Sequence, residues 1–299
     1  MSAVRISGWT ALLLAVASAG GLMMLCWPLL VHGHDRVQPP FVFIALLPLM
    51  VALVLAELTA GGLDARVLAI LGVLSAIEGV LRGISAGTAG VELVFFLLIL
   101  AGRVFGPGFG FVLGCTSLFV SALLTAGVGP WLPYQMIGAA WVGMGAGLLP
   151  RRVGGRAEIA LLAGYGVVAA YVYGLLLNLQ GWPLLTGVTV PGHTGNLSFD
   201  PTASFTDNLV TFGHYTLLTS TLSWDTGRAI STALAVCLLG PAVLTTLRRA
   251  ARRAHIAEHA EHAAQESQGH RGEPGPGVDP DPAIGPGGPG GPGAPGSAR

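Results

Sequence analysis

Long apolar runs constrain this chain more than any other feature. A bilayer core about 30 Å thick needs around 20 mostly apolar residues per helix, and eight segments meet or approach that length. They cover residues 9–31, 41–60, 67–85, 91–105, 108–127, 131–149, 157–179 and 229–247. Hydrophobic residues make up 52% of the chain and charged residues only 10%, which is far from the composition of soluble domains. We therefore predict an all-α membrane protein with about eight transmembrane helices.

The positions of the arginines predict the orientation of these helices. With eight spans, both termini lie on one side, and the positive-inside rule makes the arginine-rich side cytoplasmic. The arginines on that side are Arg5, Arg66, Arg103, Arg151, Arg152, Arg156, Arg248, Arg249, Arg252 and Arg253. Only Arg36, Arg82 and Arg228 lie at or near the other side. We expect a multi-pass protein of the cell membrane with both termini cytoplasmic and a long external loop over residues 180–226.

The kinds of basic and sulfur-containing residue exclude some functions. The 15 basic residues are all arginines, so the chain lacks the lysine that a Walker A phosphate loop requires. Any ATP hydrolysis would belong to another subunit. Cys26, Cys115 and Cys237 lie in apolar runs without CxxC spacing, as expected of small residues that pack between helices. We predict no cofactor.

The last 49 residues differ in composition from the rest. Residues 251–299 are rich in Ala, Glu and His and then in Pro and Gly, too polar and too broken to form a core. We predict a disordered cytoplasmic tail. His255, His259 and His262 have helical spacing and so could ligate a metal on one helix face, but a solvated helix beside the membrane is the favoured interpretation.

Ionisable residues inside spans are costly, by about 2.5–3.5 kcal/mol at a helix centre, so each needs a reason. Glu78 and Arg82 are four residues apart and either neutralise each other on one helix face or form part of a functional site. Glu92 opens the fourth predicted span on the external side. It is either an interfacial carboxylate or a group that faces a ligand in an external cavity.

The turn over residues 127–135 contains two prolines together with Trp131, Tyr134 and Gln135. Non-helical backbone near membrane depth is tolerated where it is buried or lines a cavity. The turn therefore either lines an external binding cavity or contributes to an aromatic belt at the bilayer surface.

Small residues recur at helical spacing on two of the predicted spans. Ala11, Ala15 and Ala19 share a face of the first span, and Gly72 and Ala76 share a face of the third. Such faces allow helices to approach closely. Packing within the chain is the favoured interpretation, and docking of another subunit is the alternative.

Taken together, residues 66–149 resemble the substrate-binding S components of energy-coupling factor (ECF) vitamin transporters. The resemblance rests on a set of segments rather than on one motif. These segments are the small-residue helix that begins at Arg66, the Gly-rich stretch 101–114, the turn and helix start at 129–136, and the glycine-spaced stretch 143–147.

This resemblance implies a six-helix binding core over residues 66–250, preceded by two extra helices in residues 1–65. It implies a vitamin-like small molecule, with cobalamin or a precursor as the first candidate, bound externally under the loops 85–90, 127–133 and 180–226. It also implies an ECF transmembrane scaffold (T) subunit and two ATPase subunits as partners, and no nucleic acid. The expected substrate-binding residues are Glu92, Trp131, Tyr134, Gln135, Asn178, Trp182 and His214, and the expected partner-docking residues are Gly72, Ala76, Ala11 and Ala15.

Two other classes of function are weighed against this one. An intramembrane enzyme that acts on lipid would need a metal or nucleophile constellation, and the chain has no HExxH, no paired Asp-rich motif and no Ser/His pair in facing spans. A stand-alone secondary transporter would need internal repeats and coupling charges near the midplane, where only Glu78 and Arg82 qualify. Both alternatives are disfavoured.

Overall fold

The computed structural model describes residues 8–26, 65–85, 90–191 and 193–271, together with residues 28, 48, 51 and 52. It divides the chain into two units, residues 1–258 and 259–299, and the description below concerns the first unit. The second predicted span, over residues 41–60, lies almost wholly outside the described residues, as does the loop over residues 86–89.

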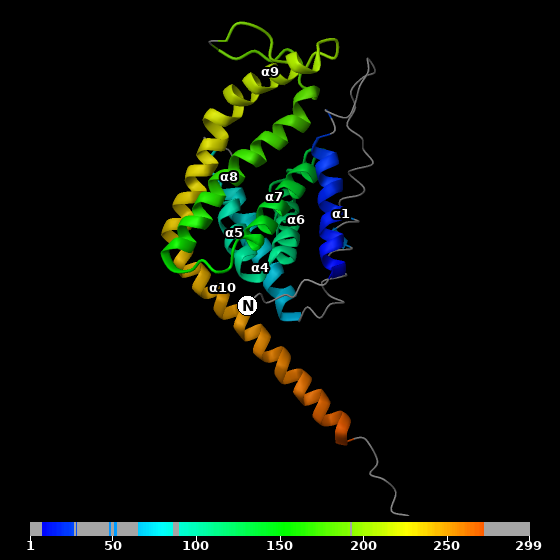
Figure 1. Cartoon of the computed structure of the whole chain (residues 1–299), viewed down its shortest axis with the longest axis vertical. Helices are drawn as coiled ribbons and strands as arrows, with labels where there is room; N and C mark the ends of the chain where they lie inside the picture. Colours follow the sequence, from blue (N-terminus) through cyan, green and yellow to red (C-terminus); the bar gives the residue numbers. More distant parts are fainter. Residues whose placement is uncertain are drawn as a thin grey trace, which may run out of the picture. The chain divides into compact units, whose positions relative to one another are not determined.

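Every secondary-structure element in the described part of the chain is a helix (Figure 1). The elements are α1 (Gly8–Leu25), α4 (Ala65–Ser85), α5 (Val94–Phe105), α6 (Pro107–Leu124), α7 (Leu132–Leu148), α8 (Gly155–Gly181), the short turn η1 (Trp182–Leu184), α9 (Phe205–Thr216), the π-helical η2 (Leu217–Asp225) and α10 (Thr226–Arg271). The all-helical prediction is thus confirmed for the described residues.

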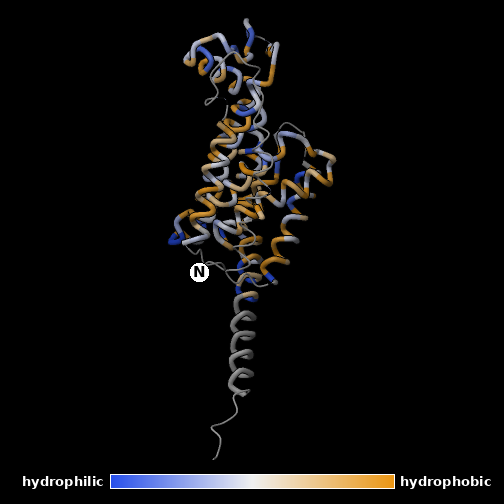
Figure 2. Tube along the Cα trace, turned by 90° about the vertical axis from the view of Figure 1, so that its right-hand side faces the viewer, coloured by the Kyte–Doolittle hydropathy of each residue, from blue (hydrophilic) through white to orange (hydrophobic). Residues whose placement is uncertain are grey.

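The helices have the length and composition that a bilayer requires. Four stretches are long and apolar enough to cross a membrane: Arg66–Ile84, Pro107–Leu124, Gly155–Leu184 and Phe205–Ala254. Figure 2 shows hydrophobic residues along the helices and hydrophilic residues mostly near their ends. The exposed side chains along these helices include large apolar ones, such as Val168, Leu234 and Leu238, as expected of surfaces in contact with lipid.

Helix α5 is the exception to the span pattern. Its 12 residues are all buried, and at 1.5 Å per residue it is too short to cross a bilayer alone. It ends at Phe105, and the next residue, Gly106, has a φ of 103°, which glycine adopts readily and other residues rarely do. Pro107 then starts α6, a position at which proline suits a helix. The chain therefore reverses in a tight α5–α6 hairpin inside the bundle.

Glycines allow α5, α6 and α7 to pack with their backbones in contact. A Cβ atom on Gly102 or on Gly110 would overlap the carbonyl oxygen of Gly143, and one on Gly114 would overlap the backbone of Ala139 and Ala140. The Gly-rich stretches of the sequence thus form the contact surfaces of the innermost three helices.

Contacts between α8 and α10 show that these two helices run antiparallel. Tyr171 hydrogen-bonds Thr226, Gly166 lies against Thr232, and Glu158 pairs with Arg248. Helix α4 runs parallel to α6, with Ser75 bonded to Thr116. One end of the bundle therefore collects the ends of α4 and α6 and the starts of α5, α7 and α10. We call it the cap end, and the opposite one the arginine end.

The small-residue faces predicted from the sequence do not pack inside the described part of the chain. Helix α1 packs against α7 through Gly21, which lies against Ile137 and Trp141, while Ala11, Ala15 and Ala19 are exposed. Helix α4 buries Leu71, Leu74 and Glu78, among others. Gly72 and Ala76 are exposed, and nothing lies within 4 Å of a Cβ atom placed on Gly72. No packing partner for these faces is found among the described residues, and packing within the chain stays a prediction for the second predicted span.

Two segments are more helical than predicted. The second half of the expected loop 180–226 forms α9 and η2, which continue directly into α10. Helix α10 itself extends to Arg271, so residues 251–271, expected to belong to a disordered tail, are helical. Residues 272–299 lie outside the described residues.

Candidate polar site at the cap end

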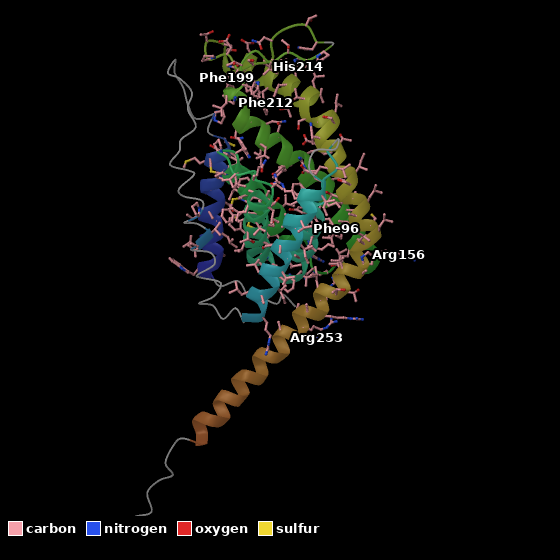
Figure 3. All side chains as sticks on the ribbon, turned by 180° about the vertical axis from the view of Figure 1, so that it is seen from behind. Phe96, Arg156, Phe199, Phe212, His214 and Arg253 are labelled. Carbon is pink, nitrogen blue, oxygen red and sulfur yellow. The ribbon has the colours of Figure 1, made fainter. Side chains whose placement is uncertain are left out.

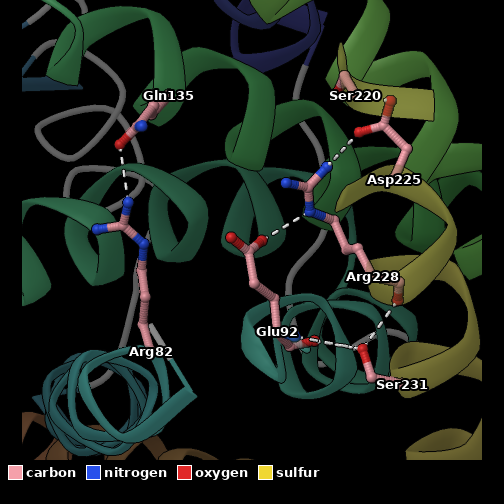
Figure 4. A network of polar contacts seen from close by, with 7 residues as sticks. All are labelled: Arg82, Glu92, Gln135, Ser220, Asp225, Arg228 and Ser231. Carbon is pink, nitrogen blue, oxygen red and sulfur yellow. Dashed lines mark hydrogen bonds and ion pairs between the residues drawn. The ribbon is translucent and has the colours of Figure 1, made fainter. Parts of the chain in front are cut away.

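A buried arginine forms the centre of the candidate site. Arg228, in the first turn of α10, donates from Nε to the Glu92 carboxylate at 2.6 Å and from Nη1 to the Asp225 carboxylate at 3.0 Å (Figure 4). Glu92 lies two residues before the start of α5, and Asp225 is the last residue of η2. The Arg228 side chain is only 9% exposed and that of Asp225 only 1%. One guanidinium therefore pairs with two carboxylates where solvent contributes little screening, and the three groups together keep one negative charge.

Two serine hydroxyls and one glycine hold the Glu92 and Asp225 segments in place. The Ser231 hydroxyl bonds the carbonyl oxygen of Glu92 at 3.1 Å and accepts from its backbone N–H. The second oxygen of Asp225 accepts from Ser220 at 3.0 Å. The Asp225 carboxylate also fits against α8 only because residue 174 is glycine, since a Cβ atom there would overlap it.

Aromatic rings cover the faces of the guanidinium. The Arg228 Cζ lies 5.0 Å from the centroid of the Tyr173 ring and 5.7 Å from that of Phe95. These two rings meet edge to face at 5.0 Å. Cation–π contacts of this kind stabilise a desolvated arginine. Gly138 of α7 makes room for Tyr173, because a Cβ atom there would clash with the ring.

A second polar group, drawn in the same view of Figure 4, joins α4, α6 and α7. Arg82 donates to the side-chain oxygen of Gln135 at 2.9 Å and to the Ser121 hydroxyl at 3.3 Å. Glu78, one turn earlier on α4, is fully buried, and neither of its carboxylate oxygens has a hydrogen-bond partner among the described residues. The hydrogen bonds found for Arg82 thus go to α6 and α7, and not to Glu78.

Five of the seven predicted substrate-binding residues belong to the bundle and its turns. Glu92 and Gln135 belong to the two polar groups just described. Tyr134 and Asn178 lie in α7 and α8, and the Tyr134 hydroxyl and the Asn178 Nδ2 are buried without a hydrogen-bond partner among the described residues. Trp131 is 51% exposed.

Trp182 and His214 belong to a folded cap, formed by residues 182–216, rather than to the bundle. Trp182 is buried, donates to the Leu197 carbonyl oxygen at 2.7 Å, and contacts the rings of Phe199, Phe212 and Tyr215. Figure 3 shows Phe199, Phe212 and His214 together at this end. His214 is exposed, with its ring centroid 5.8 Å from that of His193. Trp182 thus forms the core of the cap. Its packing and its hydrogen bond there account for its burial without any contact to a ligand.

Polar contacts also stabilise the irregular part of the cap. The Asp200 carboxylate accepts from the Thr202 hydroxyl at 2.6 Å and from its backbone N–H at 2.8 Å, and these hydrogen bonds lower the pKa of Asp200. The Ser204 hydroxyl accepts from the backbone N–H of Asp207, the usual side-chain cap of a helix start. The cap is therefore an ordered structure.

Arg228 and Asp225 are central to the site but were not among the residues predicted for it. Their spacing of three residues at the start of a helix suits an ion pair, and this was the available signal. Their contact with Glu92, which lies 136 positions away in the chain, has no signature in a single sequence.

The arginine end contains a separate buried ion pair. Arg103 of α5 donates to Glu158 at 2.8 Å, and its other nitrogens donate to the carbonyl oxygens of Leu149 and Val153. Arg248 of α10 bonds the same carboxylate at 2.7 Å. This cluster ties α5, α8, α10 and the α7–α8 turn together.

Comparison with known proteins identifies one family. A family model described as the substrate-specific component of the ECF transporter matches residues 66–247, which is more than half of the chain and runs from α4 into α10. No curated protein and no solved structure matches the chain.

Proposed function

Because this chain belongs to the family of ECF-transporter substrate-specific components, we propose that it captures a vitamin-like small molecule at the cap end and presents it for import. Membership makes the chain a membrane transport component and not an enzyme. Proteins of this family bind a small-molecule substrate and work with a scaffold T subunit and ATPases. The chain has no lysine for a Walker A loop, so the energy would come from those ATPases.

The observation that supports a substrate site at the cap end is the concentration of polar groups there. Arg82 and Glu92 precede Asp225 and Arg228 by more than 130 positions in the chain, and all four lie at the cap end of a largely apolar bundle. Charged groups at such depth are expensive and usually serve function. Guanidinium and amide donors beside carboxylate acceptors suit a ligand that has carboxyl, amide or hydroxyl groups on an apolar body.

Cobalamin or a precursor remains our first candidate for the ligand. Phe205 in the cap over residues 182–216 and Trp131 in the turn before α7 are both exposed, and such aromatic side chains suit a large ligand with apolar edges. We place the cap end outside the cell and the arginine end in the cytoplasm. On this orientation, the two exceptional arginines Arg82 and Arg228 are explained by the internal contacts that they make.

The proposal is tested by purifying the tagged chain from its native membrane. We expect a scaffold subunit and two ATPases to co-purify and the chain to bind one member of a vitamin panel. Recovery without these partners, together with no binding to the panel, would contradict the proposal. Accumulation of a substrate in proteoliposomes that contain this chain alone, without ATP, would instead support a secondary transporter.

The second polar group gives a prediction about affinity. Replacing Gln135 with leucine removes the acceptor of the Arg82 hydrogen bond, and a hydrogen bond to a charged group contributes about 1.5–3 kcal/mol. We expect Q135L to bind the ligand at least about tenfold more weakly, as measured by isothermal titration calorimetry. The control is Leu238→Ala on the exposed surface of α10, which should bind normally. Equal affinity of Q135L and the unaltered chain would exclude Gln135 from the site.

The exposed face of α4 gives a prediction about assembly. We propose that Gly72 and Ala76, with Ala11 and Ala15 on α1, dock the scaffold subunit, since small residues allow close helix approach in membranes. Gly72→Leu should leave the fold intact, because nothing lies within 4 Å of the added Cβ atom, but should prevent co-purification of the scaffold. Thermal unfolding and ligand binding of the isolated variant should match those of the unaltered chain. Normal complex formation by this variant would remove Gly72 from the docking face.

A further inference from the structure

Helix α10 and the α7–α8 turn present more positive charge at the arginine end than the fold uses. Six arginines there are exposed: Arg151, Arg152, Arg156, Arg249, Arg252 and Arg253. None of them has an ion pair or a side-chain hydrogen bond with any residue that the structure describes. Figure 3 shows two of them, Arg156 and Arg253, at the end of the unit opposite the cap. We call these six residues the arginine patch.

Nearby acidic residues do not neutralise the patch. Glu158 lies two residues after Arg156, but it is buried and already paired with Arg103 and Arg248. These two arginines outnumber their shared carboxylate, so this cluster adds positive charge to that of the patch. Between Val94 and Phe199 the sequence contains no Asp or Glu other than Glu158. The next acidic residue, Asp200, belongs to the cap. Among the residues whose side chains the structure describes, no carboxylate pairs with the patch, so its charge is left to attract external anions.

The patch borders the apolar helix stretches that are expected to cross the bilayer, so the bilayer's phosphates are expected at its level. The apolar stretch 229–247 of α10 ends directly before Arg248, and its exposed side chains include Leu234, Leu238 and Leu239. Arg156 likewise lies in the first turn of α8, whose apolar stretch follows it. The guanidinium groups thus border the surface that contacts acyl chains, which favours a lipid over a nucleic acid or an acidic protein.

We propose that the arginine patch binds the headgroups of anionic phospholipids. A guanidinium presents a planar pair of N–H donors that matches two phosphate oxygens. Arginines beside a membrane surface each contribute about 1 kcal/mol of attraction to anionic lipids, which is a factor of about five in affinity. The patch binds lipid from both sides of the α7–α8 connection and from α10, with Arg151 and Arg152 in the turn, Arg156 in the first turn of α8, and three arginines on α10. This inference does not depend on the identity of the transported substrate.

The test is native mass spectrometry of the full chain in neutral detergent, titrated with phosphatidylglycerol or phosphatidylcholine of identical acyl chains. We expect the unaltered chain to retain phosphatidylglycerol at least tenfold more tightly than phosphatidylcholine, and this preference to weaken as salt is raised. Two charge-removing variants, R249Q/R252Q/R253Q and R151Q/R152Q/R156Q, should each lose most of the preference. The matched control R249K/R252K/R253K keeps the charge and should retain part of it.

Each arm of the experiment has a contrary outcome. Equal retention of the two lipids by the unaltered chain, at low and at high salt, would overturn the proposal without any variant. So would an undiminished preference in both glutamine variants. Competition by inorganic phosphate as effective as that by phosphatidylglycerol would show a site for free anions, and preferential binding of RNA over lipid would show a nucleic-acid surface. Either of these results would also overturn it.

Discussion

Replacing Arg228 with alanine is expected to destabilise the protein strongly and to abolish ligand binding. The change leaves the carboxylates of Glu92 and Asp225 close together without their shared cation. Breaking a buried ion pair by removing one partner costs about 3–5 kcal/mol, and here one removal breaks two pairs. Unfolding of the purified variant, followed by a thermal-shift assay, should begin at a markedly lower temperature.

Two further variants separate charge from shape at this position. The triple variant E92Q/D225N/R228M has no charge to compensate and should recover most of the lost stability, because neutral replacements of buried ion networks are often tolerated. It should still fail to bind the ligand. Arg228→Lys keeps the positive charge, but its single side-chain nitrogen cannot replace the two nitrogens with which arginine reaches the two carboxylates. Its stability should lie between those of Arg228→Ala and the triple variant. Normal stability of Arg228→Ala would show that the network does not stabilise the fold.

Replacing Gly143 with valine is expected to prevent folding. The backbones of Gly143 and Gly110 are in contact, and a Cβ atom on Gly143 would overlap the Gly110 carbonyl group. Since the obstacle is backbone, no side chain can rotate to relieve it, and the cost should exceed the roughly 1–3 kcal/mol typical of overpacked cores. We expect loss of the monodisperse peak in detergent size-exclusion chromatography.

The matched control is Gly164→Ala in α8, where nothing lies within 4 Å of the added Cβ atom. Alanine is favoured over glycine inside a helix by about 0.5–1 kcal/mol, so this variant should be at least as stable as the unaltered chain. Gly143→Ala should already be destabilised despite the same gain in propensity. A Gly143→Ala variant as stable as Gly164→Ala would contradict the close packing of α6 and α7.

Hydropathy predicted the positions of most helices that each span the bundle as a single long element. The predicted segment 67–85 corresponds to Ala65–Ser85, and 131–149 to Leu132–Leu148. It failed at α9 and η2, because the Ser, Thr, Asn and Asp residues of that region resemble a loop. The Ser204 side-chain cap that starts α9 was a readable local signal of a helix there.

The site was predictable in part for a related physical reason. An acidic residue such as Glu92 in an apolar sequence stands out, and so do the amide and aromatic residues of the turn before α7. Their partners do not, because the Glu92–Arg228 and Arg82–Gln135 contacts depend on how helices pack. Likewise, Gly72 and Ala76 are exposed because the face of α4 that packs into the bundle is the one that carries Glu78. The sequence alone does not show which face packs inward.

Ligand capture by the isolated chain is the central claim, and native mass spectrometry of the chain reconstituted alone tests it most directly. After incubation with a vitamin panel that includes cobalamin and its precursors, we predict one added ligand per chain, displaced by an excess of the same unlabelled compound and absent from Arg228→Ala. A chain that is folded by thermal-shift assay and yet retains no member of the panel at any concentration tested would contradict the account.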